Sequence, residues 1–175
     1  QETSLTVSHW LGEKFWLYNN SYGNNYQKVY DLICRQTEEK KADFIVIDNI
    51  MALDLSQADK DKYEAQTRFI WMLKKLAAIA NAHVLFVAHP RKAAGFLRLD
   101  DVSGSGNIGN IVDNAFIVHR NNDDFRNQTK SQYKRPDSWE GYSGSNVIEI
   151  CKNRDLGAQD FYIPLWYEPQ TKRLK

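Results

Sequence analysis

Two short, unbroken apolar runs constrain the fold of this chain more than any other feature. The first run, Phe44–Ile47, leads directly into Asp48 and Asn49, and the second, residues 83–88, ends at His89. Runs of this length and composition are typical of strands buried on both faces, as in parallel sheets. When a helix connects two such strands, the connection is a right-handed crossover. The sequence therefore predicts an α/β fold.

Amphipathic helices are predicted before and after the first run. Residues 25–41 carry apolar side chains at helical spacing, and so does a second segment, in which Glu64 can pair with Arg68 one turn later. The apolar positions of the two segments are Tyr26, Val29, Tyr30 and Ile33, then Phe69, Met72, Leu73, Leu76 and Ile79. The expected fold class is α/β, with a mostly parallel sheet and helices on both faces.

Shorter elements complete the expected domain. We expect strands at 14–18 and 115–119, a short helix at 107–112, and an antiparallel pair of strands at 147–151 and 161–167, at the sheet edge. Residues 121–144 show no periodicity, so a long irregular loop is expected there. A chain of 175 residues with 42% hydrophobic content can bury one core, which predicts a single domain over residues 1–175.

Charge and cysteine content narrow the function only slightly. Lys and Arg number 23 and Asp and Glu number 22, so whole-chain charge neither demands nor excludes a nucleic acid. Cys34 and Cys151 are far apart in sequence and have no paired metal-ligand spacing, which argues against a zinc site or a disulfide framework. A reducing, cytoplasmic location fits best. No apolar run approaches the ~18 residues of a membrane-spanning helix, so no membrane partner is expected.

Asp48, Asn49 and His89 follow strands that are expected to be neighbours. The carboxyl ends of parallel strands meet at one edge of a sheet, where ligands bind. A carboxylate there can hold the Mg²⁺ of a triphosphate, an imidazole can contact the terminal phosphate, and a cation can offset transition-state charge. Asp and Asn also favour turns, and a hydrophobic strand followed by Asp is common. On this pattern alone, a simple loop and a phosphate site both stay open.

Four segments together resemble the RecA-like domain of replicative ring helicases, the family that includes DnaB, the phage primase-helicases and Twinkle. They follow the family's order and approximate spacing, and the match runs from about Phe15 to the end of the chain. The segments are 43–49 (Asp-Phe-Ile-Val-Ile-Asp-Asn), which matches the Walker B motif, 83–92, which ends His-Pro-Arg-Lys, 101–120, which contains Ser-Gly-Ser-Gly, and 151–157 (Cys-Lys-Asn-Arg-Asp-Leu-Gly). For the fold, this resemblance implies a RecA-like P-loop NTPase core.

For the function, the resemblance implies an ATP-dependent DNA helicase motor in a ring, usually a hexamer. Such a ring hydrolyses ATP or another NTP between subunits, moves along single-stranded DNA and unwinds the duplex. Asp48 would position Mg²⁺, Asn49 would lie against the nucleotide, and His89 would contact the γ-phosphate and report its loss. Arg154, with Lys152, would act from the neighbouring subunit as an arginine finger. Without the resemblance, His89 only ends a strand, and the two cations are solvated edge charges.

DNA contacts are expected on loops that face the channel of such a ring. The best candidates are Arg91, Lys92 and Arg98, because lysine and arginine suit backbone phosphates. Lys60 and Lys62 are a second choice, for which an ordinary surface role is preferred. The irregular segment 121–144 mixes cations and aromatic residues that can stack on bases, but its acids cancel the basic charge.

The sequence departs from the family in having no Gly-Lys-Ser/Thr phosphate loop and no match to the catalytic glutamate expected before Walker B. We expect this chain to be the carboxyl-terminal part of a helicase domain, truncated at its amino end and inactive by itself. The incomplete sheet would expose apolar surface, so self-association is a further hypothesis. The alternatives are a RecA-like recombination ATPase and a non-catalytic DNA-binding or assembly module of RecA-like fold. The helicase interpretation adds a nucleoid or phage replication site and a primase as expected context.

Overall fold

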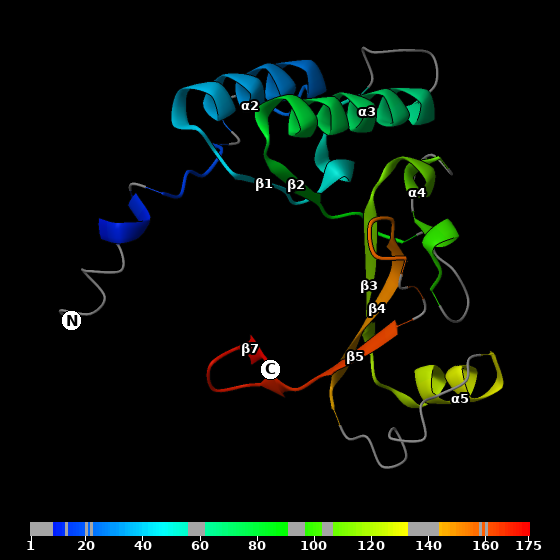
Figure 1. Cartoon of the computed structure of the whole chain (residues 1–175). Coiled ribbons are helices and arrows are strands. Elements are labelled where there is room, and N and C mark those ends of the chain that lie inside the picture. The colour runs from blue at the N-terminus through cyan, green and yellow to red at the C-terminus, as the bar shows by residue number, and fades with distance from the viewer. Residues whose placement is uncertain are drawn as a thin grey trace.

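A computed structural model describes most of the chain (Figure 1). The described residues are 9–12, 14–19, 21, 23–55, 62–90, 97–102, 107–132, 144–157, 159 and 161–175. Two helices lie above a pair of parallel strands, and a separate antiparallel sheet runs downward beside them. The carboxyl-terminal hairpin lies near the lower end of that second sheet.

The first layer consists of α2 (Tyr26–Lys40) and α3 (Lys62–Ala80) on one face of β1 (Phe44–Ile47) and β2 (His83–Phe86). The two strands pair in parallel, as expected for a crossover through α3. Both predicted helices are confirmed, and Glu64 pairs with Arg68 at 3.8 Å. The core between the layers consists of Ile47, Ile50, Phe69, Ile70, Leu73, Ile108 and Ile111.

The helical spacing groups Ile79 with the apolar residues of α3, but Ile79 does not share their buried face. Ile79 is 74% exposed, whereas Phe69 and Leu73 are buried. Successive residues turn by about 100° around a helix, which places Ile79 outside the stripe centred on Phe69, Ile70 and Leu73. Apolar spacing alone did not reveal how narrow that stripe is.

The second sheet has the order β3–β4–β5 and is antiparallel throughout. Its strands are β3 (Asn114–Arg120), β4 (Asn146–Asn153) and β5 (Phe161–Leu165). The antiparallel pairing predicted for the last two strands is confirmed. In the described residues β3 does not pair with β2, so parallel pairing is confined to β1 and β2. The 3₁₀ turn η2 (Ile50–Ala52) follows β1, whereas the 3₁₀ turn η3 (Leu99–Asp101) and the short helix α4 (Ile108–Ile111) lie between the two sheets in the chain.

The carboxyl-terminal strand is shorter than predicted. It ends at Leu165, and β6 (Tyr167–Glu168) pairs instead with β7 (Arg173–Leu174) in a small hairpin. The break falls at Trp166, whose backbone exchanges two hydrogen bonds with Lys175 rather than continuing along β4.

The aromatic segment 14–18 is not a strand, which corrects the prediction. Phe15, Trp16 and Leu17 are exposed, and no strand pairs with them in the described residues. A strand forms only where a neighbour satisfies its backbone groups, and residues 14–18 have a strand-like composition without that neighbour.

The segment 121–144 contains a helix where an irregular loop was expected. α5 (Asp123–Gln132) begins after Asn122, whose side chain accepts a hydrogen bond from the Phe125 amide at 2.8 Å. Asp123 and Asp124 in its first turn suit the positive end of the helix dipole. Phe125 is buried against His119 of β3, with ring centroids 5.0 Å apart. A helix with a single apolar residue has no hydrophobic period, so the sequence pattern did not predict α5. Residues 133–143 of this segment lie outside the described residues.

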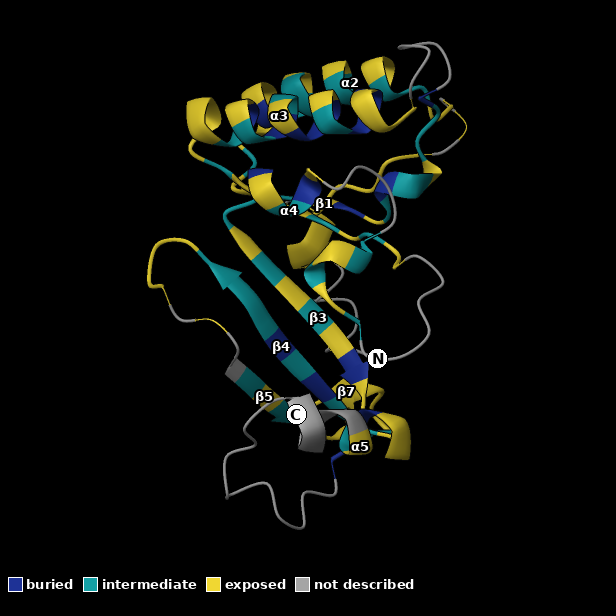
Figure 2. Cartoon of the chain, turned by 90° about the vertical axis from the view of Figure 1, so that its right-hand side faces the viewer, coloured by how far each residue is buried: buried dark blue, intermediate teal, exposed yellow. Residues whose placement is uncertain are grey.

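Among the described residues, the β1–β2 sheet and the β3–β4–β5 sheet each expose apolar side chains on one face. Along β3, exposed and covered residues alternate, as Figure 2 shows in yellow and teal. Phe116 and Val118 are more than half exposed, and so are Phe44 and Val46 on β1. Residues Ile163, Leu85 and Val87 extend these faces with smaller exposed fractions.

Two further sequence expectations concern cysteines and membranes. Cys34 and Cys151 are both free thiols. In the described part of the chain, no helix combines the length and the apolar character needed to cross a bilayer.

Candidate nucleotide site

The carboxyl ends of β1 and β2 lie side by side. Ile47 is in register with Phe86, and the ladder continues through hydrogen bonds from the Val87 amide to the Ile47 carbonyl and from the Ile50 amide to the Val87 carbonyl. Asp48 follows Ile47 directly, and His89 follows Val87 after one intervening residue. The structure thus places both side chains at the same edge of the parallel pair, the edge where α/β proteins bind ligands.

Asn49 connects the two strand ends. Its side-chain oxygen Oδ1 accepts a hydrogen bond from the Ala52 amide at 3.1 Å and so caps the 3₁₀ turn η2. Its side-chain nitrogen Nδ2 lies 2.9 Å from Nε2 of His89. The peptide bond between Asp48 and Asn49 is cis. A single asparagine therefore joins the end of β1, the turn that follows it and the imidazole at the end of β2.

Asp48 is exposed beside this pair. No cluster of three or more His, Cys, Asp or Glu that could enclose a metal exists in the described residues. Mg²⁺ is held in many nucleotide sites by one or two carboxylates, with water and phosphate oxygens completing its octahedron. A single accessible carboxylate at the strand edge fits that kind of site, so Asp48 is the residue that would hold the ion.

Three cationic side chains, Lys74, Lys152 and Arg154, lie around Asp113 and the carboxyl end of α4. Lys74 on α3 donates to Oδ1 of Asp113 at 2.6 Å, and Arg154 donates to the same oxygen at 3.2 Å. Lys152 on β4 donates to the Gly109 carbonyl of α4 at 2.7 Å. All three side chains also reach carbonyls near the carboxyl end of α4, at Ile111 for Lys74 and at Asn110 for the other two. The negative end of a helix dipole favours cations in this position.

The three cations outnumber the one carboxylate, Asp113, that pairs with two of them. Burial lowers the pKa of the Lys152 ammonium below its ordinary value, the Arg154 cation and the Lys74 cation lower it further, and Asp113 alone opposes the shift. Arg154 stays accessible, because about half of its side chain (48%) is exposed. A guanidinium with this exposure can reach an anion outside the chain.

Sequence reasoning missed two members of this group, Lys74 and Asp113, as interacting residues. Lys74 follows the buried Leu73 on α3, and Asp113 precedes β3. A lysine next to the apolar stripe of a helix is a weak signal, since such side chains commonly extend to water. Only the packing of α3 on α4 brings Lys74 to Asp113.

The predicted site residues form two separate groups rather than one. Asp48, Asn49 and His89 gather at the β1–β2 edge, whereas Lys152 and Arg154 gather at α4. Within the described ranges, no hydrogen bond or ion pair joins either cation to Asp48 or His89.

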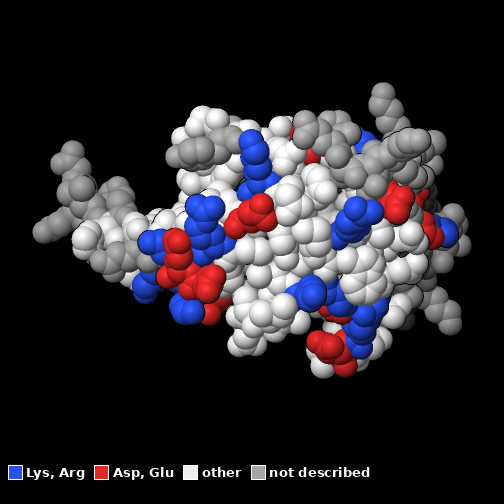
Figure 3. Space-filling model, turned by 90° about the horizontal axis from the view of Figure 1, so that it is seen from above, with Lys and Arg blue, Asp and Glu red and all other residues white. Residues whose placement is uncertain are grey.

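The expected DNA-binding residues are only partly described. Arg91, Lys92 and Lys60 lie outside the described residues. Arg98 is exposed, and its backbone amide donates to Asp101 at 2.7 Å. Lys62 is exposed at the first position of α3. Seen from above, over the helical layer, cations and acids are interspersed (Figure 3). No continuous basic stripe is visible among the described residues on that face.

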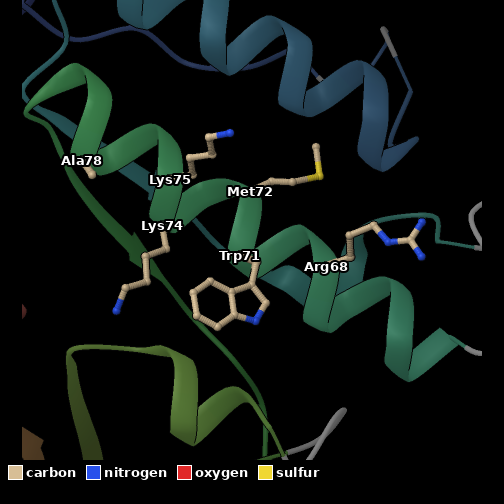
Figure 4. Close-up of a pocket in the computed structure, with 6 residues that line it drawn as sticks. All are labelled: Arg68, Trp71, Met72, Lys74, Lys75 and Ala78. Atoms are coloured by element: carbon tan, nitrogen blue, oxygen red, sulfur yellow. The ribbon is translucent and has the colours of Figure 1, made fainter.

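A hollow of about 470 Å³ lies along α3 (Figure 4). It is lined by Arg68, Trp71, Met72, Lys74, Lys75 and Ala78. In the close-up, Trp71 and Lys74 extend from α3 toward α4. None of the residues at the β1–β2 edge lines this hollow, so it is separate from the candidate nucleotide site.

Comparison with known families decides which kind of protein this geometry belongs to. A family model described as an AAA domain matches residues 2–95, more than half of the chain. The chain belongs to this AAA domain family. The matched part of the AAA domain includes α2, β1, α3 and β2, and therefore Asp48, Asn49 and His89.

Individual relatives add detail. The AAA domain is 34% identical over 85 residues to a Twinkle homolog protein, chloroplastic/mitochondrial, of Arabidopsis thaliana, and the match covers 46% of this chain and 12% of that protein. A DnaB-like replicative helicase, solved in a study of its interactions with primase, has a TM-score of 0.63 at 18% identity, with 86% of this chain and 34% of the helicase chain covered. A second solved structure, an isolated ATPase domain, has a TM-score of 0.63 at 16% identity, with 86% of this chain and 51% of that domain covered.

These findings confirm the resemblance to the DnaB and Twinkle type of helicase domain and confirm the RecA-like α/β fold. The AAA domain described here spans between an eighth and about half of the length of these relatives. The roles of individual site residues stay predictions.

Proposed function

We propose that this AAA domain is part of the motor of an ATP-dependent replicative DNA helicase. The observation that carries the proposal is the meeting of Asp48 and the Asn49–His89 pair at the carboxyl edge of β1 and β2, in a RecA-like fold. The match to a Twinkle homolog supports it, because the matched relative is named for that type of helicase. Hydrolysis would occur at subunit interfaces of a ring that moves on single-stranded DNA and unwinds the duplex.

The chemistry follows from the two groups of side chains. Asp48 would hold the Mg²⁺ that accompanies ATP or another NTP, and the ion would offset charge that develops during phosphoryl transfer. His89 would contact the γ-phosphate and respond to its loss. In the proposed scheme the cations Lys152 and Arg154 reach the nucleotide of a neighbouring subunit. The exposure of Arg154 supports this assignment.

This arrangement lacks the segment that cradles phosphates in P-loop enzymes. The chain contains no Gly-Lys-Ser/Thr sequence, and the match covers only 51% of the solved ATPase domain that it resembles. We therefore expect the 175-residue chain to bind ATP weakly or not at all and to show no hydrolysis above a control that carries Asp48→Ala. Turnover that depends on Asp48 would contradict this expectation.

The test of the proposed roles uses the complete protein from which this domain comes. Asp48→Ala should abolish Mg²⁺-dependent hydrolysis. Arg154→Ala should lower kcat by about 10³-fold or more with little change in nucleotide binding, because an arginine finger acts mainly on the transition state. Arg173→Ala, an exposed arginine on β7, is the matched control and should leave the rate unchanged.

Mixing the two variants separates action within a subunit from action across an interface. Rings that combine Asp48→Ala subunits with Arg154→Ala subunits should recover part of the activity, because some interfaces then hold one intact Asp48 and one intact Arg154. Full activity in pure Arg154→Ala rings would remove the finger assignment. No recovery in mixed rings would contradict action across an interface.

The remaining expectations of the helicase proposal are a hexameric ring, single-stranded DNA held by Arg91, Lys92 and Arg98, a primase as partner, and a cytoplasmic replication site. Strand displacement by the complete protein distinguishes a helicase from a recombination ATPase. The codons upstream of Gln1 distinguish a motor from a non-catalytic DNA-binding or assembly module, since only the motor requires Gly-Lys-Ser/Thr there.

A further inference from the structure

We infer that Asn49 is a positioning residue that holds His89 in the tautomer with its proton on Nδ1. The ring then presents an N–H donor, rather than a lone pair, to whatever binds at the strand edge. The inference about the tautomer stands on the geometry of the described residues. Only its use toward a terminal phosphate rests on the function proposed above.

The first step is the orientation of the Asn49 amide. Its Oδ1 accepts from the Ala52 amide at 3.1 Å. If the amide were turned over, its NH₂ group would face the Ala52 N–H, and two donors would meet. The backbone donor therefore fixes which end of the amide points away from η2. The end that points to His89 is the NH₂ group.

The second step is the state of the imidazole. An NH₂ group can only donate, so the ring nitrogen that it meets must accept. That nitrogen is Nε2, at 2.9 Å. In a neutral imidazole one nitrogen is a donor and the other an acceptor, so an accepting Nε2 places the proton on Nδ1. The identity of the partner therefore determines the tautomer, as it does for histidines that bind metals.

The third step is what the free side of the ring offers. In the described residues Nδ1 has no hydrogen-bond partner, and His89 is exposed. Phosphate oxygens only accept hydrogen bonds at neutral pH, and hydrogen bonds to ionised acceptors are the strong ones. An Nδ1–H donor suits a terminal phosphate, whereas an Nδ1 lone pair would repel it. Asn49 thus prepares His89 for an anion before the anion arrives.

The tautomer is measured directly by long-range ¹H–¹⁵N NMR of the full chain labelled with ¹⁵N at histidine. The chain has four histidines, so the spectrum is simple, and His89→Gln assigns the signal. At a pH where the ring is neutral, His89 should show a protonated Nδ1 and an unprotonated Nε2. His83, which stacks on Phe44 and is not bonded to Asn49, is the internal reference.

Two variants of Asn49 test the cause. Asn49→Ala removes the donor, and Asn49→Asp replaces it with an acceptor; both should move the proton of His89 to Nε2. Asn24→Ala is the matched control, because the Asn24 side chain donates to the Ala52 carbonyl in the same turn but does not touch His89. It should leave the His89 signals unchanged. Unaltered His83 signals in every variant show that the fold is retained.

A protonated Nε2 in the unmodified chain would overturn the inference, and so would an Nδ1–H signal that survives both Asn49 variants. In the complete protein, Asn49→Ala should lower kcat by about 10- to 100-fold with a small change in KM, as for loss of a residue that orients a catalytic group. If the tautomer behaves as expected but the rate does not fall, the inference about Asn49 holds and the proposed role of His89 fails.

Discussion

His119 and Glu149 form the most buried polar pair among the described residues. Nε2 of His119 and Oε2 of Glu149 are 2.7 Å apart, and each side chain is 5% exposed. The two residues lie on the covered face of β3 and β4, where Phe125 of α5 closes over the imidazole. A buried polar group that loses its partner keeps its full desolvation cost. The pair is therefore a sensitive point of the second sheet.

Glu149→Ala should lower the free energy of unfolding by about 2–3 kcal/mol, because it leaves the imidazole buried without its acceptor and opens a small cavity. Glu149→Gln should cost less, since the amide oxygen still accepts a hydrogen bond from His119. Urea unfolding followed by fluorescence measures both values. Glu64→Ala, at an exposed ion pair on α3, is the control and should change stability by less than about 0.5 kcal/mol. Equal losses for Glu149→Ala and Glu64→Ala would contradict the importance of burial.

At the scale of elements, α5 contacts the second sheet through Phe125. Among the described side chains of this helix Phe125 is buried, and its neighbours in the first turn are exposed acids. Isolated helices of this length are marginal in water, so most of the stability of α5 comes from tertiary packing.

Phe125→Ala should release α5 while β3 and β4 stay paired. Amide hydrogen exchange in residues 123–127 should become much faster, and exchange in α3 should not change. Arg126→Ala, which removes the exposed ion pair to Asp123 and leaves Phe125 in place, should alter exchange in α5 less than Phe125→Ala does. Protection of α5 that persists in Phe125→Ala would show that other contacts hold the helix.

Sequence periodicity predicted the elements that carry many apolar residues. α2, α3, β1, β2 and the antiparallel pair followed from spacing, because each buries a stripe or a face. α5 did not, since one aromatic anchor creates no period. Residues 14–18 show the opposite failure, because a strand-like composition cannot supply the neighbour that a strand needs.

The candidate site likewise has one part that the sequence predicted and one part that it did not. The convergence of Asp48 and His89 followed from parallel strand order, which sequence reveals. The contact between Asn49 and His89 joins residues 40 apart, and the contact between Lys74 and Asp113 joins residues 39 apart. Such pairs depend on the detailed packing of elements, which no local pattern encodes.

For the whole molecule, the uncovered sheet faces matter most. Phe44 and Val46 on β1 and Phe116 and Val118 on β3 place large apolar side chains in water. Contiguous apolar patches on a soluble protein mark surfaces that another chain or segment covers. This observation agrees with the hypothesis that the incomplete sheet drives self-association.

The 175-residue chain should therefore sediment faster as its concentration rises. The double variant Phe116→Lys, Val118→Lys should weaken this dependence, because each lysine would have to be buried in the contact. Ile79→Lys adds the same kind of charge at an exposed apolar residue of α3 and should leave the dependence largely intact. A monomer at every concentration would refute self-association. If Ile79→Lys weakened the concentration dependence as much as the double variant does, the contact would not lie on the sheet face.

Lys74 and Arg154 both donate to the same carboxylate oxygen of Asp113. An outside phosphate that replaced Asp113 on the guanidinium would displace an internal carboxylate, so under the proposed function this binding would be an exchange between two anions rather than a simple gain. Lys74 remains behind to neutralise Asp113 during the exchange. Under the proposed function, Asp113 would be the resting partner to which the arginine returns whenever the adjoining subunit is empty.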